Sequence, residues 1–320
     1  MRYSRREIGK LALAALPAAA LLERPLAVLG QSKPNSVVNG VNLGTITYSY
    51  RGMPDQRAEA ILRYVVDSGI SQIEFMGSPV EAFAGAPQMP RGAVAGRGAP
   101  STPHQQTIQR EHATKLRAWR TSVSMDRFKA LRSMFNEAGV SIYAWKQLAT
   151  DMTDEEIEYV FNVAEALGNT HVTLELTDDV AQLKRLGQFA EKKKIYVAYH
   201  THLQGNINAF DRAFAASKAN MANVDLGHYV AAGGDPLVFL NRFHDRIASF
   251  HLKDRTVPAN GQKNLPWGTG DTPLVQILQT VRKNRWKMPA TIELEYEVPT
   301  GSDAVREVVK CLEFCKRALA

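Results

Sequence analysis

The sequence predicts one closed parallel barrel of the (β/α)8 class over residues 36–320. Short apolar segments that read as buried strands alternate eight times with longer segments of helical period. Polar residues of ligand type gather where these strands end, and that face carries the active site in such barrels. A chain of 320 residues, 45% of them apolar, can bury a full core.

The first four strand–helix units follow from apolar periodicity and helix-start signals. Ile61, Tyr64 and Val65 have the spacing of one helix face. Thr153, with Glu156 three residues later, forms a capping box that begins a helix. We expect strand 40–47, helix 56–67, strand 72–76, helix 125–138, strand 141–146, a helix after 153, strand 171–176 and helix 178–193.

The last four units repeat the pattern. We expect strand 195–200, helix 208–218, strand 223–225, helix 236–243, strand 247–251, helix 273–284, strand 290–295 and a final helix from 303. In that final helix Cys311 and Cys315 lie one turn apart and so share a face. We expect a buried pair of free thiols there, rather than a disulfide or a metal site.

Residues 79–124 interrupt the alternation. Gly, Pro and Ala dominate from 84 to 103, and a basic, polar stretch follows through 120. We expect a surface loop that is partly helical near its end. Loops of this length in compact domains are either functional lids or inert segments, and both interpretations stay open here.

Residues 1–35 have the pattern of an export signal. A charged start containing Arg5 and Arg6 precedes an apolar stretch through Leu22 that is short for a membrane span. The arginine pair, with Ser4 before it and Lys10 after it, resembles a twin-arginine signal. We therefore expect an exported, periplasmic protein with no stable membrane anchor after processing.

The net charge of +7 gives weak support for a nucleic-acid partner. Six basic and two acidic residues within 1–35 account for four of those seven charges. Only +3 remains for the barrel, so we expect no nucleic-acid partner.

The strand ends carry the candidate site, above all in the stretch 222–255. Carboxylates and imidazoles that converge from several strands can hold a hard or borderline divalent ion. No cysteine lies at these strand ends to supply a thiolate ligand. The candidate metal ligands are Glu175, His200, Asp225, His251 and Glu293.

Each of these candidates has an alternative interpretation. Asp225 could merely cap the following turn, His251 could be a hydrogen-bonded core histidine, and Glu175 could form a salt bridge. Glu293 and Glu295 alternate onto the same side of their strand, and we favour Glu293 as the ligand.

The remaining histidines are assigned elsewhere. His171 begins a strand and is expected to be structural, while His104, His112 and His244 are expected to face solvent.

Four runs now carry a resemblance to a known family. They are Asp-Leu-Gly-His-(x4)-Gly-Gly-Asp-Pro from 225, His-Leu-Lys-Asp-Arg from 251, Trp-Gly-Thr-Gly-Asp from 267 and Ile-Glu-Leu-Glu-Tyr from 292. Together they resemble the sugar phosphate isomerase/epimerase family of xylose isomerase-like barrels, over most of the chain from about Gly40.

The resemblance implies one divalent metal ion (Mn, Mg, Zn or Co) held by a Glu, an Asp, a His and a second Glu. Asp225, His251 and Glu293 match the last three positions. At the first position the chain departs from the family, because it has Tyr199-His200-Thr-His202. Either His200 or Glu175 is expected to take that place.

The expected activity is proton abstraction beside a carbonyl, giving an isomerase or epimerase of carbohydrates. Export, and the lack of a familiar Gly-rich phosphate cradle, favour an unphosphorylated sugar or keto-sugar. The same site could instead eliminate a β-substituent, as a 3-keto-glycoside lyase or hydratase.

Candidate acids and bases lie beside the proposed ligands. They are Lys253 and His228, with Lys146 and Glu295 in reserve, and Glu74, His202 and Trp267 are expected to bind substrate. Lysine suits this role if its pKa is lowered or if it stays charged and stabilises an oxyanion. The alternative for Lys253 is a surface salt bridge to Asp254.

Two other functions compete with a sugar-converting enzyme. Endonucleases that cut DNA at abasic sites share this barrel but hold several zinc ions and bind a polyanion, which the charge near +3 disfavours. An exported, non-catalytic sugar-binding barrel is the second alternative. A small carbohydrate is the expected partner of both a sugar-converting enzyme and a sugar-binding barrel. The sequence does not decide whether the protein forms a homo-oligomer.

Overall fold

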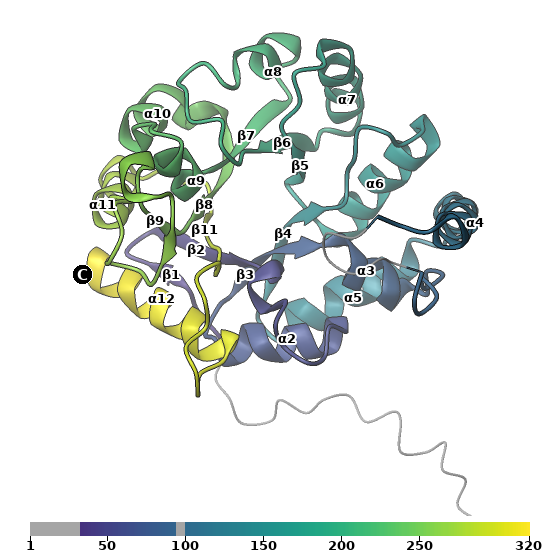
Figure 1. The fold of residues 1–320 in the computed structure, drawn as a ribbon, viewed down its shortest axis with the longest axis horizontal. Coiled ribbons are helices and arrows are strands. Elements are labelled where there is room, and N and C mark those ends of the chain that lie inside the picture. The colour runs from purple at the N-terminus through teal and green to yellow at the C-terminus, as the bar shows by residue number, and fades with distance from the viewer. Residues whose placement is uncertain (1–32, 94–99) are drawn as a thin grey trace, which may run out of the picture. The chain divides into compact units, whose positions relative to one another are not determined.

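The computed structural model describes residues 33–93 and 100–320, and these form the predicted closed barrel of eight parallel strands (Figure 1). The strand order is closed because β2 pairs with both β11 and β3. The barrel strands are β2 (Val41–Ile46), β3 (Gln72–Met76), β4 (Ser141–Lys146), β5 (His171–Glu175), β6 (Tyr196–His200), β7 (Asn220–Asp225), β8 (Ile247–Leu252) and β11 (Ala290–Ile292).

A ring of helices covers the outside of the barrel (Figure 1). The capping box at Thr153 and Glu156 is present and begins α6 as predicted. The ring contains α2 (Ala58–Asp67), α5 (Asp126–Glu137), α6 (Asp154–Leu167), α7 (Val180–Lys193), α8 (Asp211–Ala216), α10 (Pro236–Phe243), α11 (Leu274–Asn284) and α12 (Ala304–Leu319).

Short elements decorate this frame. They are strand β1 (Val37–Val38), the antiparallel pair β9 (Asp254–Arg255) and β10 (Asn264–Leu265), helix α9 (Leu226–Ala231), and the 3-10 turns η2 (Thr47–Tyr50), η3 (His244–Arg246) and η4 (Pro258–Asn260). The turn-long α9 directly after β7 was not predicted, because the sequence signal there was read as a tight turn.

The apolar core lies between the barrel and the helices. Phe75, Trp145 and Phe250 are among its fully buried side chains. The space inside the barrel is different, since several of its inward residues are polar and hydrogen-bonded. Cys311 and Cys315 are buried and free, as predicted.

The expectation for 79–124, a surface loop that is partly helical near its end, holds in part, and the segment is more helical than expected. Helix α3 (Gly77–Ala84) continues from β3, and α4 (Pro103–Arg120) is a long helix that begins at a capping box formed by Thr102 and Gln105. No residue of α4 is buried, so its sequence lacks the apolar stripe that identifies most surface helices.

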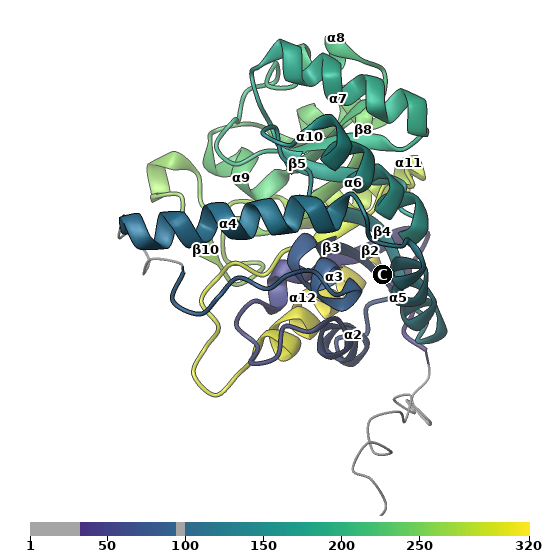
Figure 2. The same cartoon turned by 90° about the vertical axis from the view of Figure 1, so that its right-hand side faces the viewer.

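Charged side chains, together with Trp119 packed on Phe128 and Tyr159, hold the C-terminal end of α4 against the neighbouring helices. Arg120 Nε lies 2.8 Å from Glu81 Oε1, and its Nη1 lies 3.0 Å from Glu156 Oε1. Arg117 adds a contact of 3.0 Å to Glu156. Figure 2 shows α4 lying lengthwise along the outside, with its other end reaching past the carboxyl ends of the strands.

One expectation falls outside this description. The predicted export signal covers residues 1–35, and residues 1–32 lie outside the described part of the chain. Within the described residues, no helix has both the length and the apolar character needed to cross a bilayer.

Candidate metal centre

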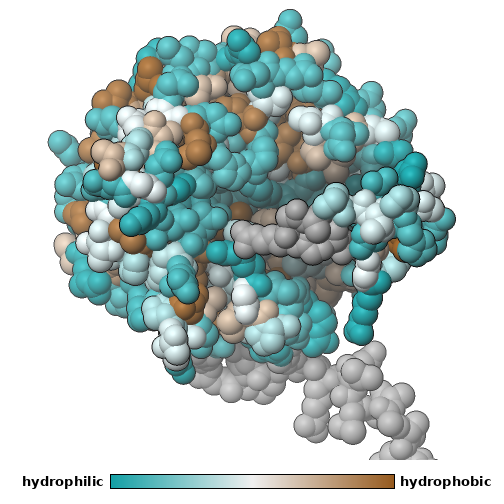
Figure 3. Space-filling model, in the orientation of Figure 1, coloured by the Kyte–Doolittle hydropathy of each residue, from teal (hydrophilic) through white to brown (hydrophobic). Residues whose placement is uncertain are grey.

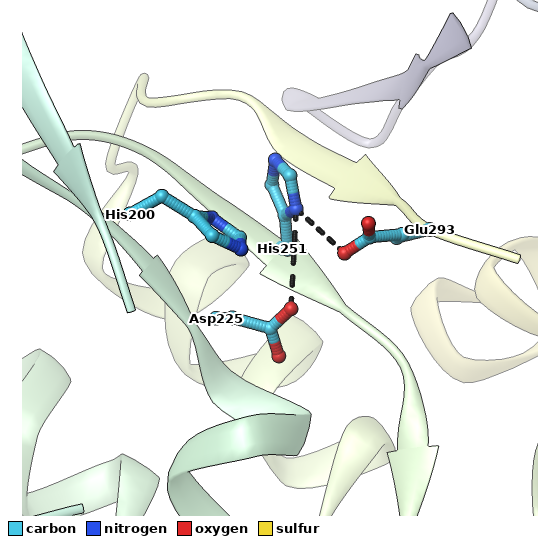
Figure 4. A group of neighbouring side chains, drawn as sticks. All are labelled: His200, Asp225, His251 and Glu293. Atoms are coloured by element: carbon cyan, nitrogen blue, oxygen red, sulfur yellow. Dashed lines mark hydrogen bonds and ion pairs between the residues drawn. The ribbon is translucent and has the colours of Figure 1, made fainter. Parts of the chain in front are cut away.

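Four of the predicted metal ligands meet at the carboxyl end of the barrel (Figure 4). His200 and Asp225 are the last residues of β6 and β7, His251 is near the end of β8, and Glu293 directly follows β11. Each offers one ligand atom, and these atoms lie within 4.8 Å of one another. The face that carries them is largely hydrophilic and has a hollow near its centre (Figure 3).

The donor set fits a divalent ion. Two imidazoles and two carboxylates suit Zn²⁺, Mn²⁺ or Co²⁺, and all four residues are buried. Asp225 Oδ1 accepts a hydrogen bond of 2.7 Å from the backbone N–H of His228, so Asp225 does cap the following helix. Its Oδ2 is buried and faces the ammonium group of Lys253 at 2.8 Å.

His251 lies between two carboxylates. Its Nε2 is 2.8 Å from Glu74 Oε2, and its Nδ1 is 2.8 Å from Glu293 Oε2. Burial alone would lower the pKa of His251, but the charges of Glu74 and Glu293 raise it to about 10. Burial opposes ionisation of Glu74 as well, yet His251 lowers the pKa of that carboxyl to about 2.

Lys253 supplies a buried cation beside the four residues. Its Nζ lies 2.8 Å from Asp225 Oδ2, 2.8 Å from Glu293 Oε2 and 2.6 Å from Glu295 Oε2. Burial disfavours its charge, but these carboxylates raise its pKa above the ordinary value. Lys253 therefore stays an ammonium group at neutral pH.

The alternative of a surface salt bridge from Lys253 to Asp254 is wrong. Lys253 is only 2% exposed. The Asp254 carboxylate accepts hydrogen bonds from the backbone N–H groups of Gly268 and Gly270, among others. It therefore fixes the loop after β10 and does not pair with Lys253.

His228 is held by an arginine that can only donate. Arg255 Nη1 contacts His228 Nδ1, so that nitrogen accepts and Nε2 carries the hydrogen. Burial, together with the charges of Lys253 and Arg255, lowers the pKa of His228 to about 2. His228 Nε2 lies 3.8 Å from Glu295 Oε2 and presents a neutral N–H donor to the site.

Glu175 lies outside the buried four and forms the salt bridge considered for it. Its carboxylate is 2.9 Å from Lys146 Nζ and 2.9 Å from His202 Nδ1. With His200 and His202 it forms a second, more exposed group of possible ligand atoms. Burial raises the pKa of Glu175, but the hydrogen bond from His202 and the charge of Lys146 lower it overall.

Two of the three expected substrate-binding residues lie in other surroundings. Glu74 is fully buried, and both of its oxygens accept hydrogen bonds from the protein, so it is out of reach of a substrate. Trp267 packs edge-on against Phe314 of α12 at 5.8 Å between ring centroids. His202, with a side chain 56% exposed, is the one that a substrate can reach.

The other histidines largely follow expectation. His171 is buried at the start of β5 and contacts Ser249 Oγ at 2.8 Å, which confirms a structural role. His104 and His244 are exposed, whereas His112 is half-buried and contacts the Pro87 carbonyl.

Sequence reasoning missed Asn223, Ser249 and Arg255. Asn223 and Ser249 precede Asp225 and His251 by two residues, so they point to the same side of their strands. That alternation is a usable signal in the sequence for polar residues that face the inside of the barrel. Arg255 had no signal in the sequence, since its contact with His228 depends on the turn after β8.

Comparison with known proteins finds one matching family model and several similar proteins. A family model described as xylose isomerase-like TIM barrel matches residues 155–315. An inosose dehydratase of Lacticaseibacillus casei is 34% identical over 77 residues, which cover 22% of this chain and 26% of the relative. The chain thus matches about a quarter of the length of that relative.

Two solved structures are similar in fold. The probable 3-DHS dehydratase AsbF from Bacillus anthracis has a TM-score of 0.58 and 14% identity, covering 85% of this chain and 98% of that one. The 3-keto-D-glucoside 4-epimerase YcjR from E. coli has a TM-score of 0.58 and 11% identity, covering 86% of this chain and 100% of that one.

Proposed function

The chain belongs to the xylose isomerase-like TIM barrel family, and on this basis we propose that it is a divalent-metal-dependent enzyme acting on an unphosphorylated polyhydroxy ketone. The proposed reaction begins with removal of a proton from the carbon beside the carbonyl. The observation that carries this proposal is the convergence of His200, Asp225, His251 and Glu293 on one point. A divalent ion held there would act as a Lewis acid toward a carbonyl oxygen.

Glu295 is the proposed base. Its side chain is 21% exposed, against 0% for Asp225 and 7% for Glu293, so it is the carboxylate of this group that a substrate can reach most easily. Lys253, at 2.6 Å, holds the Glu295 carboxylate in place. The raised pKa of Lys253 excludes it as a base and assigns it to the stabilisation of negative charge.

His228 is proposed to donate a hydrogen bond from Nε2 to a substrate oxygen. Its Nδ1 accepts from Arg255, so the ring cannot take up a second proton without losing that contact. This is a donor role, in place of the acid–base role predicted for His228 from the sequence.

We propose elimination of a β-hydroxyl as the overall outcome. This preference is supported by the curated relative matched in sequence, which is an inosose dehydratase. Lys146 or the exposed His202 then supplies a proton to the departing hydroxyl, since the hydrogen bond to Glu175 raises the pKa of His202. The elimination releases one water molecule and leaves a carbon–carbon double bond beside the carbonyl.

Epimerisation is the second candidate. It needs proton-transfer groups on both sides of the substrate, and the site has Glu295 with Lys253 in one group and Glu175 with Lys146 in another. The fold neighbour YcjR, a 3-keto-D-glucoside 4-epimerase, agrees with this outcome.

The test is incubation of the metal-loaded protein with inosose, a 3-keto-D-glucoside and D-allulose in deuterated water, followed by NMR. Deuterium uptake, or loss of water, that chelation abolishes is the expected result. Glu295→Gln should bind metal normally and lose exchange. Stoichiometric metal without exchange on any of these ketones would refute the enzyme proposal and favour the sugar-binding barrel.

We also propose export to the periplasm on the strength of residues 1–35. Cell fractionation of the full-length chain and of an Arg5→Lys, Arg6→Lys variant tests this. Export that survives the double substitution would argue against a twin-arginine route.

A further inference from the structure

A buried carboxylate lies beneath the candidate metal centre, inside the barrel. Glu74 is fully buried on β3 and contacts three neighbours. Its Oε1 accepts from Thr173 Oγ1 at 2.7 Å, and its Oε2 contacts His251 Nε2 at 2.8 Å and Asn223 Nδ2 at 3.2 Å. An ionised carboxylate has no hydrogen to donate, so each of these neighbours must donate to it.

The contact with His251 determines which ring nitrogen can face an ion. Since Nε2 donates its hydrogen to Glu74, the lone pair of a neutral His251 ring belongs to Nδ1. Nδ1 is the nitrogen on the side of Glu293 and Asp225, at 2.8 Å and 3.9 Å from their oxygens. Glu74 therefore leaves Nδ1, the nitrogen that faces Glu293 and Asp225, as the one that could bind an ion.

Glu74 also determines which nitrogen of His200 carries hydrogen, and it does so through Asn223. Asn223 directs its Nδ2 group to Glu74 and, at 2.6 Å, to Ser249 Oγ. The amide oxygen of Asn223 is consequently turned toward His200 Nδ1, at 2.9 Å. Because an amide oxygen only accepts, His200 Nδ1 carries the hydrogen and Nε2 keeps its lone pair.

We propose that Glu74 is a positioning residue that sets the tautomer of both imidazoles in the centre, directly for His251 and through Asn223 for His200. One buried carboxylate thus sets which ring nitrogen carries hydrogen in two histidines on different strands. The tautomer of His251 and the relevance of this arrangement to an ion rest on the proposed function, whereas the tautomer of His200 does not. Partners of this kind are worth about 10- to 100-fold in metal affinity in other metal sites.

Three substitutions separate the elements of this proposal. Glu74→Met removes both acceptors at similar length. Glu74→Gln can still accept from His251 and Asn223 with its oxygen while its amide donates to Thr173, so it tests charge alone. Thr173→Val removes a contact to the other oxygen of Glu74 and leaves both relays in place, which makes it the matched control.

The readout is a long-range proton–nitrogen NMR correlation of the histidine rings, together with metal dissociation constants from competition with a chelator. The His200 tautomer is measured on the metal-free protein at and above neutral pH, where one nitrogen of a neutral ring carries hydrogen and the other does not. A His200→Gln variant assigns the signal, and circular dichroism checks the fold of each variant.

In the unsubstituted protein, His200 should show hydrogen on Nδ1, and Glu74→Gln and Thr173→Val should retain that pattern. Glu74→Met should mix or invert the tautomer and weaken Zn²⁺ binding by about 10- to 100-fold. The proposal is overturned if Glu74→Met keeps both the tautomer and the affinity within about twofold, or if His200 carries its hydrogen on Nε2 from the outset. If Glu74→Met does not fold, Asn223→Ala replaces it and should release the His200 tautomer alone.

These outcomes also separate this proposal from the proposed function. A protein that binds no Zn²⁺ but shows the expected His200 tautomer, lost in Glu74→Met, would refute the metal-dependent reaction and support the positioning role of Glu74. A protein that binds Zn²⁺ equally with and without Glu74 would refute the positioning role only.

Discussion

Replacing Lys253 with methionine should destabilise the metal-free protein and make added metal more stabilising. The ammonium group lies 2.6 to 2.8 Å from oxygens of Asp225, Glu293 and Glu295 and is buried with them. Methionine keeps most of the volume and removes the charge. Three carboxylates then remain close together with one fewer cation between them.

The magnitude follows from the burial of the group. Removing one partner of a buried ion pair costs about 3–5 kcal/mol, because the remaining charge is left uncompensated. For a chain of this size, roughly 2 °C of melting temperature corresponds to each kcal/mol, so the metal-free variant should melt roughly 6–10 °C below the unsubstituted protein. A divalent ion can replace the lost positive charge, so metal should raise the melting temperature of Lys253→Met by more than that of the unsubstituted protein.

The assay is a pair of thermal melts for each protein, with chelator and with saturating Mn²⁺ or Zn²⁺. Lys146→Met is the matched control, since Lys146 pairs with a half-exposed Glu175 and should cost less than about 1 kcal/mol. The reasoning fails if metal-free Lys253→Met melts with the unsubstituted protein, or if metal raises the melting temperature of both proteins equally.

Three further outcomes follow from the structure. Gly227→Ala should abolish turnover and lower metal affinity, because an added Cβ would lie 2.2 Å from Lys253 Cγ and 2.7 Å from the Lys253 carbonyl oxygen; kinetics and chelator competition measure this. Below about pH 4.5, α4 should lose protection in hydrogen exchange. Burial raises the pKa of Glu156, but the hydrogen bonds to this carboxyl lower its pKa overall. The stability that Glu156 contributes is therefore complete above its ordinary pKa of 4.5 and is lost as the pH falls through the lowered pKa of the folded protein. Cys311 and Cys315 should not react with a thiol reagent until the protein is unfolded, since burial raises the pKa of Cys311 to about 12.

The first two of these outcomes have control variants. Gly52→Ala should leave turnover and metal affinity unchanged, since a Cβ there meets nothing within 4 Å. Arg120→Met should release α4 at neutral pH as well, because it removes the cation held by Glu81 and Glu156. Protection of α4 that persists to pH 2 in the unsubstituted protein would contradict the role given to Glu156. Rapid labelling of the native thiols would contradict their burial.

The barrel and most of its strands were predictable because parallel strands read as short apolar runs of fixed spacing. The predicted strand 72–76 coincides with β3, and 141–146 coincides with β4. The convergence of Asp225, His251 and Glu293 was predictable for a related reason: the carboxyl ends of parallel strands in a barrel share one face.

Depth inside the barrel was not predictable from alternation alone. Alternation places Glu74 inward, but it does not say that a residue in the middle of β3 lies under His251 and not at the mouth. That depends on how far each strand is staggered against the next. The full extent of helix α4 was not predictable for a different reason, since the helix has charged contacts through Arg117 and Arg120 and no buried apolar stripe.

The hydrogen-bonded layer inside the barrel restricts how this protein can diverge. Glu74, Asn223 and Ser249 each have a hydrogen-bond partner on another strand. Replacing one of them by an apolar residue would leave a buried polar group without its partner, at a cost of about 1–3 kcal/mol. Tolerated changes there must therefore come as coordinated pairs, whereas the loops above can vary one residue at a time. In an engineering campaign, new substrates are best sought by randomising the rim, with this inner layer held constant.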